Sequence, residues 1–154
     1  MTTLHVYLDT EFTTLNRYRA QLISLALVVP GGPEFYVELT DTWSAEDCSP
    51  FVIDTVLPLL DRARYGRTTD KARAELLAFL QALGPVEVIS DAPDHDWPLL
   101  LWLAGPAGLP ANVQPEPGHL SIDLNADYAG DDPPHHALQD ARLLAALVEK
   151  TNPA

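Results

Sequence analysis

Two short segments at opposite ends of the chain contain side chains that could do chemistry. Asp9 and Glu11 stand two residues apart in a predicted buried strand, so both carboxylates would face the same side. His135 and Asp140 stand five residues apart at the start of a predicted apolar-faced helix. Carboxylates that folding gathers from distant segments repel one another, and a divalent cation relieves that repulsion. With a further acid from the middle of the chain, the set predicts metal-assisted cleavage of a phosphodiester bond.

Each half of this set also has a purely structural interpretation. Asp9 and Glu11 could be an exposed pair where a strand meets its loop, because acidic residues are frequent in this chain. His135 and Asp140 could be solvated residues of the first helical turns. His136 competes with its neighbour, since it precedes Asp140 by four residues and could make an ordinary helical side-chain contact. Against this, Asp140 borders the apolar stripe of the helix, where an acid without a partner is costly.

The middle acid follows the short apolar segment 86–89, which is predicted to be a buried strand. Three aspartates follow the end of this strand: Asp91, Asp94 and Asp96. Functional sites in α/β proteins tend to form where such strands end. Asp96 would lie in the first turn of the next helix, whereas Asp91 and Asp94 could be turn or capping residues. The residues alone leave open whether Asp91 or Asp94 assists Asp96.

Length and composition indicate one domain, spanning residues 1–154, that can bury a single sizeable core. Cys48 is the only cysteine, so no internal disulfide can form, which is typical of a reducing compartment. No signal peptide is visible, and the apolar runs 22–29 and 97–104 are far shorter than the ~20 residues that span a bilayer. We therefore expect a soluble, cytoplasmic protein that does not associate with membranes.

The formal net charge of −13 limits the choice of substrate. Proteins that hold long nucleic acids normally present a basic surface, because the release of condensed counterions supplies much of the affinity. This chain has only nine Lys and Arg residues, and four of them lie between positions 62 and 71. Either nucleic acid is not the substrate, or the substrate is short and is held by metal ions and a few local cations.

The hydrophobic pattern predicts both strands and helices. Strands are expected at 4–8, 21–29, 34–39, 86–89 and 120–124, and helices at 50–60, 69–83, 95–104 and 133–150. The turn signal at 30–33 makes the second and third strands a hairpin, and 105–118 is a loop rich in proline and glycine. This order of elements predicts an α/β fold with a mixed sheet of about five strands flanked by helices.

Taken together, the clusters resemble the motifs of the DEDD exonucleases of the ribonuclease H-like superfamily. Within these, the chain is most similar to the histidine-containing subgroup of RNase T, oligoribonuclease and proofreading subunits, and closest to its small bacterial and phage 3′-5′ exoribonucleases. Residues 9–11 match the first motif, 90–96 resemble the second, and 135–140 match the third. The spacing in the family selects Asp96 as the middle acid and His135, rather than its neighbour, as the histidine.

The resemblance implies a ribonuclease H-like domain that binds two Mg²⁺ or Mn²⁺ ions. Asp9 would bridge both ions, and Glu11, Asp96 and Asp140 would complete the ligand set, while His135 would accept a proton from the attacking water. The enzyme would act on single-stranded 3′ ends of RNA or DNA, with short RNA favoured, and release nucleoside 5′-monophosphates. Relatives often pair, so the resemblance also implies a possible homodimer.

Substrate contacts would come from the segment after the first motif. Phe12 could stack on the terminal base, Leu15 could wedge between the last two bases, and Arg17 and Arg19 could reach a phosphate. Each of these side chains could equally be an ordinary core or loop residue. The second motif departs from the family pattern, because His95 stands where an aromatic residue is usual.

Two other functions remain open at this point. One is a catalytically inactive ribonuclease H-like binding or scaffold module, although such a module would have no reason to retain a costly cluster of acids. The other is a different two-metal phosphoesterase that acts on nucleotides.

Overall fold

Strand β1 (Leu4–Phe12) is the strand from which the first two acids project, and the sheet is built around it. In the computed structural model, which describes residues 2–120 and 133–151, β1 pairs antiparallel with β2 (Leu22–Val28) and parallel with β5 (Val86–Ile89). The strand runs four residues further than the pattern predicts, because its polar end continues the ladder with β2 up to Phe12.

Two further strands complete the sheet. β3 (Glu34–Leu39) pairs antiparallel with β2, as expected for the hairpin, and the two-residue β4 (Gly66–Arg67) pairs parallel with β3. The order is β4-β3-β2-β1-β5, so the predicted α/β fold with a mixed five-stranded sheet is confirmed. The fifth strand differs from the one expected at 120–124, because β4 is too short to show any periodicity and residues 121–124 lie outside the described residues.

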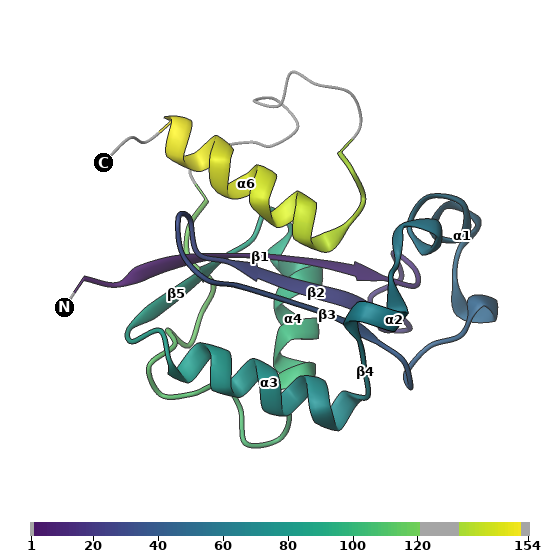
Figure 1. The fold of residues 1–154 in the computed structure, drawn as a ribbon, viewed down its shortest axis with the longest axis horizontal. Helices are drawn as coiled ribbons and strands as arrows, with labels where there is room; N and C mark the ends of the chain where they lie inside the picture. The colour runs from purple at the N-terminus through teal and green to yellow at the C-terminus, as the bar shows by residue number, and fades with distance from the viewer. Residues whose placement is uncertain (1, 121–132, 152–154) are drawn as a thin grey trace.

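Helices cover both faces of the sheet (Figure 1). α3 (Thr69–Gln81) and α4 (Pro93–Ala104) pack on one face, and α6 (Ala137–Thr151) packs on the other. α6 begins later than the predicted start at 133, because two prolines come first and His135 has a φ of 58°, which is not a helical value.

The connection from β3 to β4 is a series of short helical segments rather than the single helix expected at 50–60. The segments are η1 (Ala45–Asp47), α1 (Pro50–Thr55), η2 (Leu57–Leu59) and α2 (Arg62–Tyr65). Pro58 explains the break, since it has no amide hydrogen to continue the α1 hydrogen-bond pattern and its ring crowds the preceding turn.

Two hydrophobic cores lie on the two faces of the sheet. All seven residues of β2 are buried, as expected for a strand covered on both sides. On one face large aliphatic side chains pack against α3 and α4. On the other, Ala137, Ala141 and Ala145 of α6 belong to one buried cluster with Ala26 of β2. These small side chains allow the first turns of α6 to approach the sheet closely.

No helix in the part of the chain that the structure describes has the length and apolar character needed to cross a membrane.

The packing of α4 can be tested with two adjacent leucines. Leu100 is fully buried against the sheet, whereas Leu101 is 40% exposed. Leu100→Ala should lower the free energy of unfolding by about 2–5 kcal/mol, because it leaves a cavity. Leu101→Ala should cost less than about 1 kcal/mol. Urea denaturation measures both, and equal losses would mean that α4 presents a different face to the core.

Candidate active site

The first two acids project from the last part of β1 toward the α6 face of the sheet. Asp9 lies opposite Ala26 and Glu11 lies opposite Ser24 in the register with β2. Small residues at these cross-strand positions leave space above the sheet next to the carboxylates. Asp9 and Glu11 are both partly buried beneath the start of α6.

Asp96 approaches the carboxylates of Asp9 and Glu11 from the edge of β1 that is next to β5. β5 ends at Ile89, which pairs with Tyr7, so the edge of β1 beyond Tyr7 is not paired with β5. The first turns of α4 occupy that space. Asp96 is only 2% exposed, and Thr10 Oγ1 donates a hydrogen bond of 2.6 Å to its Oδ1. Ser90 Oγ donates a hydrogen bond of 2.5 Å to its Oδ2, so both carboxylate oxygens are held in place.

Asp140 and His135 come from the start of α6. The amide of Asp140 donates a hydrogen bond of 2.8 Å to the carbonyl of His136, which places Asp140 in the first turn of the helix. His135 has a left-handed backbone, with φ at 58°. That conformation is uncommon for a residue with a Cβ atom.

These segments converge on one pocket of about 210 Å³. Its lining includes all five residues expected from the sequence, Asp9, Glu11, Asp96, His135 and Asp140, together with Asp91 and Phe12. One carboxylate oxygen from each of Asp9, Glu11 and Asp140 lies within 4.8 Å of the other two. The same holds for one oxygen from each of Asp9, Asp91 and Asp96. Asp9 belongs to both groups and is therefore the centre of the cluster.

The crowding of acids raises their pKa values. Burial raises the pKa of Asp9 well above its ordinary value, and repulsion from Asp96, Glu11 and Asp140 adds to the effect. Burial and the charge of Asp140 raise the pKa of Glu11 to about 8. Burial likewise raises the pKa values of Asp96 and Asp140 to about 7 each. At neutral pH, the isolated chain therefore retains protons on some of these carboxyl groups.

Two buried oxygens in the cluster indicate what would relieve this repulsion. Asp9 Oδ2 and Asp140 Oδ1 are buried and have no hydrogen-bond partner among the described residues. A buried carboxylate oxygen without a donor is costly. Mg²⁺ and Mn²⁺ prefer oxygen ligands of this kind, so the residues present fit one or two such ions. Asp9, Glu11, Asp96 and Asp140 are the residues that would hold them.

The other two aspartates at the exit of β5 differ in position. Asp91 is exposed at the rim of the pocket and belongs to one of the two carboxylate groups. Asp94 is exposed at the start of α4 and lines a neighbouring pocket instead. The structure thus places Asp91, and not Asp94, beside Asp96.

The two adjacent histidines point to different surroundings. His135 lines the acidic pocket, and its imidazole meets the ring of Phe51 at 5.1 Å between centroids and 88° between planes. His136 does not line the pocket. Its ring lies over Tyr36 at 4.8 Å, and burial lowers its pKa. The geometry therefore favours His135 as the histidine of the site.

Of the predicted substrate residues, Phe12 lines the acidic pocket. Phe12 lines both this pocket and a neighbouring one of about 230 Å³, and it stacks on His95 at 5.3 Å with 9° between the rings. Arg17 lines the neighbouring pocket, whereas Leu15 is 77% exposed. His95 thus supplies a ring that stacks on Phe12.

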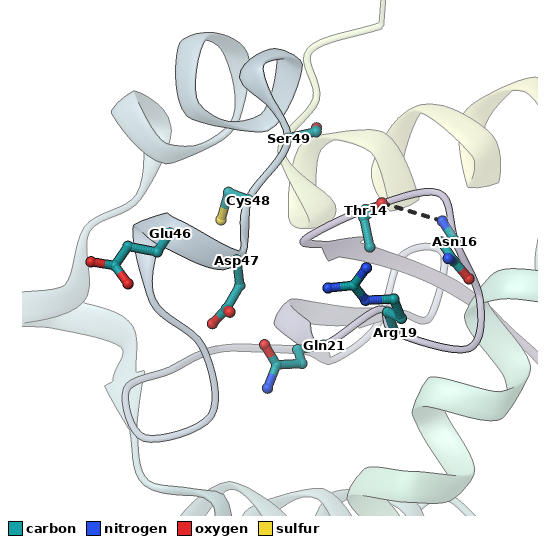
Figure 2. Close-up of a pocket in the computed structure, with 8 residues that line it drawn as sticks. All are labelled: Thr14, Asn16, Arg19, Gln21, Glu46, Asp47, Cys48 and Ser49. Carbon is teal, nitrogen blue, oxygen red and sulfur yellow. Dashed lines mark hydrogen bonds between the residues drawn. The ribbon is translucent and has the colours of Figure 1, made fainter.

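Arg19, the other cation considered for a phosphate, lies elsewhere. It lines a hollow of about 430 Å³ between the loop after β1 and segment 46–49 (Figure 2). Arg19, Glu46 and Asp47 line this hollow, together with uncharged side chains. The hollow lacks the convergent carboxylates of the smaller acidic pocket, so we assign no chemistry to it.

Three residues of the site were not predicted from the sequence. Thr10 and Ser90 donate hydrogen bonds to Asp96, and Phe51 contacts His135. Thr10 and Ser90 lie within the first and second motifs, which is a signal that could have identified them. Phe51 lies in α1, far from every motif, and no pattern in the sequence links it to the pocket.

The chain matches no protein-family model and no curated protein.

The raised pKa values predict how stability depends on pH. In the unfolded chain these carboxyl groups ionise near pH 4, whereas Glu11, Asp96 and Asp140 hold protons up to pH 7–8 in the folded protein. The folded state then binds more protons than the unfolded state, so stability falls as pH rises. In EDTA, the melting temperature should fall between about pH 6.5 and about pH 8.5. Above about pH 6.5 His136 is mainly neutral in both states and contributes little.

Saturating Mn²⁺ should remove most of this decline and raise the melting temperature at pH 8 by at least about 5 °C. Asp9→Asn should raise the melting temperature in EDTA and abolish the effect of Mn²⁺, because it removes the central charge. Asp94→Asn is the matched control, since Asp94 lies outside both carboxylate groups, and it should behave like wild type. A sharp loss of stability in Asp9→Asn would show that Asp9 has a structural role instead.

Proposed function

We propose that this protein is a metal-dependent 3′-5′ exonuclease that cleaves short single-stranded nucleic acid, with RNA favoured over DNA. The observation that supports this best is the pair of carboxylate groups that share Asp9. One group is Asp9, Glu11 and Asp140 and the other is Asp9, Asp91 and Asp96, and each would suit one Mg²⁺ or Mn²⁺ ion. When bound, the ions would lower the pKa of a water nucleophile and stabilise charge on the leaving 3′ oxygen.

The side chains of the pocket have separate roles in this proposal. Asp9, Glu11, Asp96 and Asp140 hold the cations, and the hydroxyl groups that bond Asp96 keep its carboxylate oriented. His135 accepts the proton of the attacking water, since its imidazole lines the pocket that contains the carboxylates.

Phe12 and Arg17 support binding of the 3′-terminal nucleotides. Phe12 lines the acidic pocket, and the face of its ring that does not stack on His95 would stack on a base, at roughly 1–3 kcal/mol. Arg17 lines the pocket next to it and offers a positive charge to a phosphate. Leu15 remains the candidate to separate the last two bases, because its side chain is exposed on the same loop.

The charge of the chain favours a short substrate. With a net charge of −13, the surface gives little attraction to a long phosphate backbone, so the cations of the site and Arg17 would supply most of the electrostatic binding. A cytoplasmic location and a homodimer stay predictions of the sequence and of the resemblance.

Labelled oligonucleotides test the activity directly. A 5′-labelled single-stranded RNA of a few nucleotides, incubated with Mn²⁺, should give a ladder that shortens by one nucleotide at a time from the 3′ end. EDTA should abolish the ladder, and the matched DNA should be cut more slowly. A chain that cuts neither substrate with any divalent ion would instead favour the inactive binding or scaffold module.

The assignment of the base is tested by two neighbouring substitutions. His135→Ala should lower kcat by roughly 100-fold or more, because it removes the proton acceptor. His136→Ala removes a ring that packs on Tyr36 outside the pocket and should lower kcat by less than about tenfold. Steady-state kinetics on one RNA substrate compares the two, and the reverse ranking would show that His136 is the base.

A further inference from the structure

Phe51 is an exposed aromatic residue beside the acidic pocket that no motif accounts for. It lies in α1, and its side chain is 55% exposed. Large aromatic side chains are usually much more buried than this. The contact it does make is with the imidazole of His135, at nearly a right angle between the rings.

The backbone of Phe51 is fixed by the start of α1. Ser49 donates its amide to the carbonyl of Thr13 at 2.9 Å, which ties the start of the helix to the loop after β1. Ser49 Oγ accepts a hydrogen bond from the amide of Val52, and Pro50 occupies the first turn. Val52 is buried in a small core beside Ile23 of β2. The ring of Phe51 is therefore carried by a short but anchored helix.

Among the described residues, little besides this neighbour orients the ring of His135. His135 precedes α6, and its backbone is in the left-handed region that residues with a Cβ atom seldom adopt. Within the described residues, the imidazole makes its ring contact with Phe51 and no side-chain hydrogen bond. An aromatic ring perpendicular to an imidazole favours one orientation of the pair, since ring edges and faces carry opposite partial charges.

We propose that Phe51 is a positioning residue that holds the imidazole of His135 over the carboxylate cluster. This inference rests on the proposed function, because it takes His135 as the base. Phe51 would give α1 a role in catalysis, although α1 contributes no carboxylate to the acidic cluster. The contact also gives a reason for keeping an aromatic side chain largely exposed to solvent at this position.

Kinetics on a short RNA substrate with Mn²⁺ test the proposal. Phe51→Ala should lower kcat by roughly tenfold and change KM by less than about twofold, because the base is misplaced while the binding of substrate is unchanged. Phe51→Tyr keeps the ring and should restore most of kcat. Ile53→Ala is the matched control, since Ile53 is 42% exposed on the same helix and has no aromatic ring to pack on His135. It should leave both constants unchanged.

Two results would overturn the proposal. A rise in KM at unchanged kcat in Phe51→Ala would mean that Phe51 binds substrate rather than positions the base. Unchanged kcat and KM would mean that it does neither. If the wild-type chain cuts no oligonucleotide, the proposed function fails, and the positioning role fails with it. If wild type is active and Phe51→Ala is equally active, the positioning role is wrong but the proposed function still stands.

A second readout needs no activity. The His135 ring resonances in an NMR spectrum recorded in EDTA, assigned by their loss in His135→Ala, should move when Phe51→Ala removes the adjacent ring current. They should stay in place in Ile53→Ala. Resonances that do not move in Phe51→Ala would show that the two rings are not in contact in solution, and the proposal would be wrong.

Discussion

Mutual repulsion among carboxylates in a small pocket is the constraint that dominates this structure. Two unit charges about 4 Å apart repel by about 4 kcal/mol at an effective dielectric near 20. Asp9 has close neighbours in two such groups, so full ionisation of the cluster without a cation would be strongly unfavourable. The chain must then hold protons, as the raised pKa values indicate, or hold metal ions.

The fold resists this repulsion by fixing each acid on an element that is anchored elsewhere. β1 pairs with β5 from Leu4 to Tyr7 and with β2 from Tyr7 to Phe12, so its β5 side becomes free next to the pocket, which admits Asp96 from α4. Buried hydroxyls then hold both oxygens of Asp96. On the opposite face, the alanine contacts of α6 bring Asp140 down toward Asp9. No single element places the site, since the acids project from β1, α4 and α6.

Much of this arrangement could be predicted from the sequence, and the exceptions have physical causes. The strand pattern places Asp9 and Glu11 on one side of β1, and the motif spacing selects Asp96, which the structure places beside Asp9. Periodicity could not predict β4 or the break at Pro58, because both are too local to form a pattern. The contact of Phe51 with His135 depends on how α1 packs against the sheet, so only the folded structure reveals it.

The coupling of metal binding to proton release tests the central claim most directly. Calorimetric titration of the metal-free chain with Mn²⁺ at pH 7, repeated in two buffers of different ionisation enthalpy, measures the protons released per chain. Because the cluster holds protons at that pH, we expect Mn²⁺ to bind and to displace at least about one of them. No binding, or binding without any release of protons, would contradict a cluster of carboxylates forced together by the fold.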